Sequence, residues 1–295
     1  MWGKEFFLGR YSELGWKYET VESKQAIRVN SMNIDKDKLV KRLGSRGVRV
    51  RKIPFLDDGY WVSESRFSLG ATSEYLLGLY SIQEAAAQIP AALFTALKGK
   101  TVLDACAAPG GKTVQLAQLM QNTGAIIALD IDKHRLVALS NQLERCHVEN
   151  TAVYLADARH ASQLNLKLDC ILLDVPCSGN FTTDKEWFGR RTLKDVERNA
   201  ALQKEILREA VKTLKADGEI VYSTCSLEPE EDEMNIDWAT NELNVQVEQI
   251  DCYGQKGLTD VFGKKLDSAV VNCKRIWPGP TQGFFVCKLK KRGSA

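Results

Sequence analysis

The sequence predicts an α/β fold: a largely parallel sheet flanked by helices, with a small α+β subdomain before it. Three observations support this prediction. From residue 101 onward, short apolar runs alternate with longer stretches of helical periodicity. The central runs end in an acid or a cysteine. Basic residues gather between positions 36 and 52, so we divide the chain into a basic N-terminal subdomain, 1–79, and a larger domain, 80–295.

Composition is that of an ordinary globular protein. Hydrophobic residues make up 44% of the 295 residues, enough for a substantial core. The formal net charge is only +2, so affinity for nucleic acid has to come from local clusters of charge. Apolar runs of about 18 residues are absent, so we expect no transmembrane helix. The N-terminal stretch lacks the apolar core of a secretory signal, and we expect a cytoplasmic protein.

The chain has eight cysteines and three histidines. Because no two cysteines have CxxC spacing, we expect no metal site. A cytoplasmic protein keeps its thiols reduced. Cys146, Cys170 and Cys287 lie inside apolar patterns and are predicted core residues. Cys177 and Cys225 do not fit that description.

The N-terminal part has its own pattern of elements. Residues 1–24 are predicted to form one or two short helices with aromatic anchors, whose role the pattern leaves open. Residues 26–30 alternate as a strand. Residues 35–43 follow as a helix that begins at Asp35, an acid suited to capping. Residues 48–53 alternate apolar and basic side chains as a second strand.

A cluster of cations spans this helix and the second strand, and within it only Asp37 is acidic. In a nearly neutral chain such a cluster indicates a surface that faces phosphates. The alternative is a solvated helix face, which is common for a run of charges. The members of the basic cluster are Lys36, Lys38, Lys41, Arg42, Arg46, Arg49, Arg51 and Lys52.

The motif LDACAAPGGKT, residues 103–113, lies between a predicted strand at 101–103 and a predicted helix at 112–120. Its small residues allow a ligand to approach the backbone, and the helix start offers unpaired N–H groups. Neither the dinucleotide fingerprint nor the Walker pattern is present. The motif alone therefore leaves open both a nucleotide-like ligand and a plain structural turn.

The strands that follow end in side chains of one chemical kind. Asp130, Asp157 and Asp174 lie at or just after the ends of three predicted strands, and Cys225 follows a fourth. Ligands of open α/β sheets bind at this edge, although a single acid there is usually a helix cap. The predicted strands are 125–131, 151–156, 168–175 and 219–224, with weaker ones at 245–250 and 283–289, and a helix covers 132–147.

These residues favour one kind of chemistry. Asp130 lies about 20 residues beyond the glycine turn, where it suits a ribose, and Asp157 suits an adenine amino group. Without a phosphate fingerprint, a nucleoside such as S-adenosylmethionine fits better than a dinucleotide. A thiolate can add to C6 of a pyrimidine, after which C5 can take the methyl group. A carboxyl group such as Asp174 supports that change at N3 and N4. A second group must then remove the C5 proton, and the pattern leaves open which cysteine does which.

Four motifs carry a resemblance to a known family: LDACAAPGGKT, ALDIDKHR, LLDVPCSG and STCSLEPEEDE. Together with IRVNSMNIDKDKLVKRL, LGATSEYLLGLYSIQEAA and GFFVCKLKK, they resemble the NSUN/RsmB (Sun) family of RNA cytosine-5 methyltransferases, including archaeal-type members that modify tRNA. The resemblance covers the chain from about residue 26 onward. It implies a Rossmann-like methyltransferase sheet, S-adenosylmethionine as cofactor and S-adenosylhomocysteine as product.

The resemblance also implies roles for single residues. Cys225 in the TCS motif resembles the nucleophile, and Cys177 in PCSG resembles the residue that assists product release. Asp174 resembles a residue that serves both the cofactor and the target base. The cofactor set implied by the resemblance is Cys106, Ala107, Ala108, Pro109, Gly110, Gly111, Lys112, Asp130, Arg135, Asp157 and Asp174.

The chain departs from the family pattern after PCSG, where residues 180–184 replace a small residue and a glycine. Phe181, Trp187 and Phe188 nearby could stack on unpaired bases or pin the loop to its domain. The acidic run 228–233 is predicted to begin a helix.

We expect RNA as the partner, with tRNA preferred and rRNA as the alternative, and no obligatory protein partner. The rivals are a DNA cytosine methyltransferase, in which Cys177 would be the nucleophile, and a non-catalytic RNA-binding factor.

Overall fold

A computed structural model describes residues 3–293 of the chain. These residues form two compact units. One unit is Lys24–Asp157, and the other combines the described residues up to Ser23 with those from Ala158 onward. These two units are defined by the contacts within each unit. The predicted boundary after residue 79 instead divides the chain by the expected roles of its two parts, and it stays a prediction.

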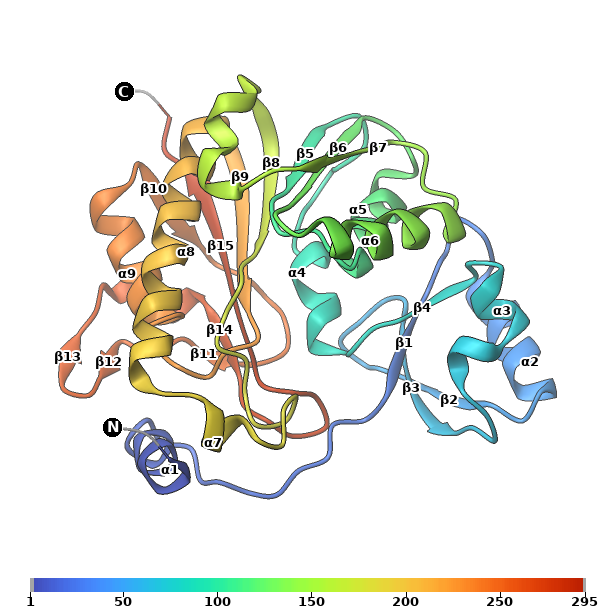
Figure 1. Ribbon diagram of the computed structural model, residues 1–295, viewed down its shortest axis with the longest axis horizontal. Helices are drawn as coiled ribbons and strands as arrows, with labels where there is room; N and C mark the ends of the chain where they lie inside the picture. Colours follow the sequence, from blue (N-terminus) through green and yellow to red (C-terminus); the bar gives the residue numbers. More distant parts are fainter. Residues whose placement is uncertain (1–2, 294–295) are drawn as a thin grey trace. The chain divides into compact units, whose positions relative to one another are not determined.

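The unit Lys24–Asp157 begins with a four-stranded antiparallel sheet in the order β2-β3-β1-β4 (Figure 1). Helix α2 (Lys36–Ser45) packs its apolar face on this sheet. It begins as predicted, because Asp35 accepts hydrogen bonds from the N–H groups of Asp37 and Lys38. The strands are β1 (Ala26–Val29), β2 (Arg49–Lys52), β3 (Gly59–Glu64) and β4 (Tyr80–Ile82).

The same unit continues with alternating strands and helices. Strands β5, β6 and β7 are parallel neighbours. Helix α5 connects β5 to β6 and helix α6 connects β6 to β7, so the predicted strand–helix order is confirmed. The bounds are β5 (Thr101–Asp104), α5 (Gly111–Met120), β6 (Ala125–Asp130), α6 (Lys133–Arg145) and β7 (Thr151–Leu155). The stretch 67–97 holds short elements beside β4: η1 (Leu69–Ala71), α3 (Ser73–Leu76), η2 (Ala86–Gln88) and α4 (Ile89–Ala92).

The other unit is built on the parallel neighbours β8 and β9, which the long helix α8 connects. Strand β15 runs antiparallel beside β9, and β10 and β14 both pair with β15. Helix α9 lies beside α8 (Figure 1). The bounds are β8 (Leu168–Asp174), α8 (Leu193–Thr213), β9 (Leu214–Thr224), α9 (Glu233–Glu242), β10 (Val245–Glu248), β14 (Lys274–Ile276) and β15 (Phe284–Lys291).

Smaller elements complete this unit. They are α1 (Lys4–Glu13), η3 (Ala158–Leu164), α7 (Trp187–Arg190), β11 (Gln255–Lys256), β12 (Asp260–Val261), β13 (Lys264–Lys265) and η4 (Ser268–Asn272). Helix α1 belongs to the same compact unit as β8 and β9, although it lies more than 150 residues before them in the chain.

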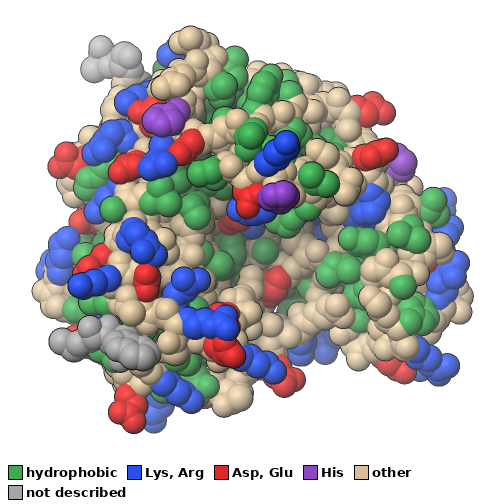
Figure 2. Space-filling model, in the orientation of Figure 1, with side chains coloured by type: hydrophobic (Ala, Val, Ile, Leu, Met, Phe, Trp, Pro, Cys, Tyr) green, Lys and Arg blue, Asp and Glu red, His purple; other side chains and the backbone are tan. Residues whose placement is uncertain are grey.

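Buried side chains form the cores that the strand pattern predicts. Cys146, Cys170 and Cys287 have no exposed surface, which confirms their prediction as core residues. In the described part of the chain, none of the helices is both long and apolar enough to cross a bilayer. On the face drawn in Figure 2, Lys and Arg side chains are interspersed with Asp and Glu side chains.

Candidate active site

The loop that connects β5 to α5 carries most of the predicted cofactor residues. Its backbone is held at both ends: the N–H of Ala107 donates to the carbonyl of Leu129 on β6 (2.8 Å), and the N–H of Gly110 donates to the carbonyl of Ala107 (2.8 Å). The Thr113 hydroxyl of α5 donates to a carboxylate oxygen of Asp104 (2.8 Å). The peptide bond before Pro109 is cis. The loop is therefore a fixed turn at the end of β5.

Gly110 is required by this turn for two reasons. Its φ of +104° lies in a region that side chains rarely adopt. A Cβ atom there would also come within 2.9 Å of a Leu139 methyl group and 3.3 Å of the Gln142 side chain, both on α6. The close approach at Gly110 therefore serves helix packing. A Cβ on Gly111 would meet only ordinary contacts.

Asp130 at the end of β6 is almost fully buried, and its carboxylate is held in place by the same loop. One oxygen accepts from the N–H of Ala108 (3.2 Å) and the other from the N–H of Asp132 (3.0 Å). The Arg135 guanidinium lies 3.4 Å from Asp130 and also donates to the carbonyl of Ala108. Each carboxylate oxygen can accept two hydrogen bonds, so Asp130 keeps capacity for a further donor.

Other predicted cofactor residues have intermediate exposure. Cys106 and Lys112 lie in the loop and in the first turn of α5, and Asp157 follows β7. All of these residues belong to the unit Lys24–Asp157. Asp174, Cys177 and Cys225 belong to the other unit.

The two unusual cysteines lie together. Cys225 directly follows β9, and Cys177 follows β8 after two residues. Their Sγ atoms are 3.1 Å apart, and both thiols are free. Each side chain is half-buried. Parallel neighbouring strands thus bring to one place two thiols that are 48 residues apart in the sequence.

The two sulfurs share a hydrogen bond. The hydrogen bond to Cys225 and burial hold the pKa of the Cys177 thiol well above its usual value, and the negative charge of Glu231 acts in the same direction. A thiol that keeps its proton can donate a hydrogen bond to its neighbour. Either sulfur can be the donor in this contact, so the pair holds one donor and one acceptor within 3.1 Å.

Asp174 ends β8 three residues before Cys177, and Ser223 of β9 lies opposite it in the sheet. The Ser223 hydroxyl donates to one Asp174 oxygen (2.8 Å). Ser223 is fully buried, so this hydrogen bond orients the carboxylate. The sequence pattern does not identify Ser223, because serine at a strand end is common.

Asn180 is the first residue of the segment in which the chain departs from the family pattern after PCSG. Its amide nitrogen donates to the carbonyl of Cys225 (2.7 Å) and to that of Gly283 (3.1 Å). Its oxygen accepts from the N–H of Thr182 (2.8 Å). Asn180 has no exposed surface. The side chain therefore ties the loop of Cys177 to the backbone of Cys225.

The aromatic residues near PCSG mainly pin the loop. Trp187 is buried, and its indole N–H donates to the carbonyl of Ser178 (2.8 Å). Its ring packs edge-on against Phe7 of α1, with centroids 4.6 Å apart. Phe181 and Phe188 are half-buried and stack on each other at 5.1 Å. The ring of Trp187 is thus covered by protein, and the interpretation that it pins the loop holds.

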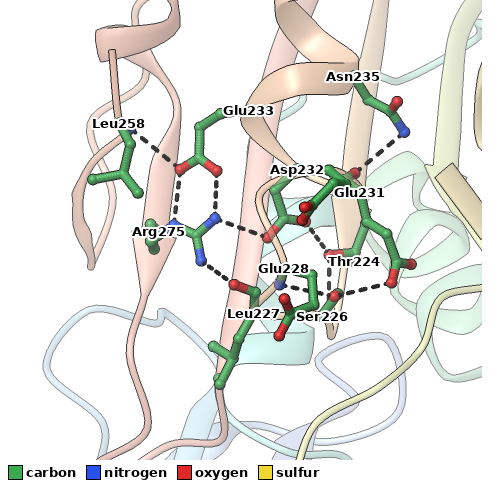
Figure 3. Close-up of polar contacts among 12 residues, drawn as sticks. Thr224, Ser226, Leu227, Glu228, Glu231, Asp232, Glu233, Asn235, Leu258 and Arg275 are labelled. Carbon is green, nitrogen blue, oxygen red and sulfur yellow. Dashed lines mark hydrogen bonds and ion pairs between the residues drawn. The ribbon is translucent and has the colours of Figure 1, made fainter. Parts of the chain in front are cut away.

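The acidic run 228–233 lies mostly inside the protein rather than on a solvated helix. Helix α9 begins only at Glu233, so the earlier acids form a loop after β9. Figure 3 shows Arg275 between two of them: its guanidinium donates to Glu233 (2.8 Å) and to Asp232 (3.1 Å). Asp232 in turn accepts from the Thr224 hydroxyl (2.6 Å), just before Cys225. The buried acids hold the end of β9.

Helix α1 supplies partners for two more of these acids. The Arg10 guanidinium donates to Glu228 (3.1 Å) and to both oxygens of Glu230 (2.7 Å). The Tyr11 hydroxyl donates to the other oxygen of Glu228 (2.7 Å). Glu228 is fully buried, three residues after Cys225. The N-terminal segment, whose role the sequence leaves open, thus packs against the loop of Cys225.

Known proteins resemble this chain over most of its length. The 28S rRNA (cytosine-C(5))-methyltransferase of Mus musculus is 33% identical over 305 residues, covering 97% of this chain and 38% of that protein. The ribosomal RNA small subunit methyltransferase F of Shewanella woodyi is 33% identical over 290 residues, covering 93% of this chain and 58% of that protein. The chain therefore spans less than two thirds of the length of these curated relatives.

A solved structure shows the same fold. The methyltransferase homolog protein from Pyrococcus horikoshii is 35% identical, with a TM-score of 0.85 over 98% of this chain and 99% of that one. The predicted Rossmann-like fold with an N-terminal subdomain is thereby confirmed. Residues 8–85 match the N-terminal domain of 16S rRNA methyltransferase RsmF. Residues 91–290, more than half of the chain, match the family model of 16S rRNA methyltransferase RsmB/F, and the chain therefore belongs to this family.

Proposed function

We propose that the protein is an S-adenosylmethionine-dependent RNA cytosine-C5 methyltransferase in which Cys225 is the nucleophile. The observation that carries the proposal is the 3.1 Å separation of the Cys177 and Cys225 sulfurs, at the ends of neighbouring parallel strands. Asp174, oriented by Ser223, lies on the first of these strands. Transfer to C5 of cytosine needs a nucleophile, a proton acceptor and a carboxyl group, and these residues provide that set.

The loop after β5 fits the proposed cofactor. Asp130 is buried, oriented by the N–H of Ala108 and by Arg135, and keeps acceptor capacity that suits a ribose hydroxyl. Asp157 supplies an acceptor for an amino group. The residues that would hold the cofactor are Cys106 to Lys112, Asp130, Arg135, Asp157 and Asp174. When bound, S-adenosylmethionine supplies an electrophilic methyl group.

The chain's own residues account for the remaining steps. The Cys225 thiolate forms a bond to C6 of the cytosine as the C5=C6 π electrons move toward C5, while Asp174 accepts a hydrogen bond from the N4 amino group and shares a proton with N3. After C5 has been methylated, Cys177 takes the C5 proton and the bond between C6 and Cys225 breaks. The hydrogen bond to Cys225 is the largest cause that raises the pKa of Cys177. Once Cys225 is bonded to carbon, that cause is removed, so the Cys177 thiol can lose its own proton to solvent and then accept the C5 proton as a thiolate.

Ribosomal RNA is the proposed substrate. Both curated relatives described above carry names of rRNA methyltransferases. Transfer RNA, preferred on the sequence alone, is the alternative, and bisulfite mapping of total RNA from cells that lack the protein distinguishes the two. The target base must leave its stack to reach the thiols, at a cost of a few kcal/mol.

The basic cluster is the proposed RNA-contact surface, and the structure divides it. Arg42 and Arg46 both bind the buried carboxylate of Glu74 (3.1 and 3.0 Å). Arg49 pairs with Glu64 (3.3 Å). In contrast, the side chains of three exposed members make no hydrogen bond or ion pair among the described residues: Lys38, Lys41 and Arg51. These three are free to meet phosphates.

Covalent trapping tests the proposal. RNA transcribed with 5-fluorocytidine blocks removal of the group at C5, so the complex with the nucleophile persists. We expect the unchanged protein and Cys177→Ala to form the adduct, and Cys225→Ala to form none. On ordinary RNA, Cys177→Ala should accumulate adduct because release is slow. Adduct in Cys225→Ala but not in Cys177→Ala would support the arrangement of DNA enzymes instead. A failure to transfer labelled methyl groups would leave a non-catalytic RNA-binding protein.

A further inference from the structure

Glu231 connects the loops of the two cysteines. It lies in the buried segment between β9 and α9. Its carboxylate accepts from the N–H of Ser178, the residue after Cys177, at 3.0 and 3.2 Å. It also accepts from the hydroxyl of Ser226, the residue after Cys225, at 3.2 Å (Figure 3). One carboxylate is thus bonded to both loops.

A third donor fixes this carboxylate from helix α8. The amide nitrogen of Gln203 donates to Glu231 (2.7 Å) and to the carbonyl of Pro176 (2.9 Å), which precedes Cys177. The Gln203 oxygen accepts from the Tyr222 hydroxyl (3.0 Å) and from the amide of Asn235 (2.8 Å). Gln203 therefore cannot turn away from Glu231 without breaking the hydrogen bonds of both its amide nitrogen and its amide oxygen.

The charge of Glu231 distinguishes it from its neighbours. Glu228 and Glu230 contact Arg10, and Asp232 and Glu233 contact Arg275. Among the described residues, the hydrogen-bond donors that reach Glu231 are neutral groups. The three donors converge on the two oxygens of one carboxylate, which can accept all of them. When Glu231 is ionised, its charge is buried without a cation among the described residues, and this burial costs free energy.

We propose that Glu231 is a positioning residue, whose carboxylate holds the loops of Cys177 and Cys225 so that the two sulfurs stay in contact. Asn180 ties the same loops from the other side through the carbonyl of Cys225. The role of this contact in catalysis rests on the proposed function. The contact itself does not, so it can be tested without RNA or cofactor.

Phenylarsine oxide is a suitable probe because its arsenic bonds two thiols only when they lie close together. Its oxygen leaves as water with the two thiol protons, so no oxidant is needed. Mass spectrometry of digested protein then measures the fraction of Cys177 bridged to Cys225. We expect rapid bridging in the unchanged protein and at least ten-fold slower bridging in Glu231→Gln. The amide of the variant presents N–H groups to at least one of the three donors, so that hydrogen bond to the loops is lost.

Two controls separate positioning from general stability. Glu230→Gln is the same substitution one residue away, at a carboxylate that contacts Arg10 and neither cysteine loop. Thr240→Ala removes a side-chain hydrogen bond of α9, to the carbonyl of Asp237, and leaves the contacts of Glu231 and Gln203 in place. Both should bridge at the rate of the unchanged protein. Ser226→Ala, which removes one of the three donors, should slow bridging two- to five-fold and serves if Glu231→Gln does not fold.

Alkylation by iodoacetamide gives a second readout that a merely structural role would not change. Burial raises the pKa of Glu231 to about 7, so the group carries a negative charge above neutral pH. That charge is one cause of the raised pKa of Cys177. The midpoint of Cys177 alkylation should therefore move to lower pH in Glu231→Gln and stay unchanged in Glu230→Gln. Bridging and midpoint both equal to those of the unchanged protein would overturn the proposal.

Discussion

At the scale of single residues, burial and charge decide what Glu231 does. A buried carboxylate without a cation is stabilised only by its hydrogen bonds, and burial outweighs them, so its pKa is raised to about 7. An acid whose pKa is raised by folding binds its proton more tightly in the folded than in the unfolded protein. Its contribution to stability is therefore complete at low pH and is lost as pH rises through the folded pKa.

This sign gives a prediction for Glu231→Gln, which cannot ionise. Between pH 5 and pH 8 the unchanged protein should lose about 2 to 3 kcal/mol of unfolding free energy through Glu231, and the variant should not. The difference in unfolding free energy between the two proteins should therefore shrink by that amount as pH rises. Urea unfolding at both pH values measures it. A difference that stays constant with pH would show that Glu231 does not titrate in this range.

At the scale of elements, α1 stabilises the loop after β9 from a distance of more than 200 residues in sequence. The buried Glu228 carboxylate accepts hydrogen bonds from two residues of this helix, the Tyr11 hydroxyl and the Arg10 guanidinium. When a buried carboxylate loses a hydrogen-bond donor, the free-energy cost of its desolvation is no longer offset, and the folded state is destabilised. The helix therefore acts as part of the framework around Cys225, although it comes first in the chain.

Tyr11→Phe tests this link, because it removes only the hydroxyl that contacts Glu228. We expect a loss of about 1 to 3 kcal/mol in unfolding free energy, measured by urea denaturation. Tyr18→Phe is the matched control: Tyr18 contacts Trp16 and Phe181 through its ring, with no hydrogen bond from its hydroxyl recorded in the described structure. It should change stability by less than about 0.5 kcal/mol. Equal effects in the two variants would count against the role assigned to α1.

The elements also show what a sequence can and cannot predict. Strands such as β5, β6 and β8 are predictable because continuous apolar runs mark strands buried on both faces. Strand β3 is not, since its exposure rises along its length instead of alternating, and β4 has only three residues. The edge strand β11 consists of two exposed residues and is defined only by its pairing with β14.

The candidate site shows the same limit. Strand-end residues such as Asp174 and Cys225 are predictable because they follow apolar runs directly. The buried acids after Cys225 are not, because a local run of acids indicates a solvated helix start. Their burial depends on Arg10 and Arg275, which are remote in sequence. The role of Asn180 is likewise evident only from the structure, in which its side chain donates to the carbonyl of Cys225.

At the scale of the whole molecule, the cations of the basic cluster have two different uses. Arg42 and Arg46 neutralise Glu74, whose carboxylate is almost fully buried. Replacing them with acids would place like charges around a buried carboxylate and destabilise the fold. Their loss would therefore weaken RNA binding for a reason unrelated to RNA. Lys38, Lys41 and Arg51, whose side chains have no partner among the described residues, are the better probes.

Changing these three residues to Glu should weaken RNA binding at least ten-fold while melting temperature and cofactor affinity stay unchanged. Each phosphate contact with single-stranded RNA contributes about 0.7 to the slope of log affinity against log salt, so the slope should fall by about 2. Fluorescence anisotropy with a labelled single-stranded, cytosine-containing RNA at several salt concentrations measures both quantities. The charge-matched control carries the same change at three exposed cations outside the cluster: Lys17, Lys98 and Lys256. If this control loses as much affinity and slope, net charge rather than the basic cluster binds RNA.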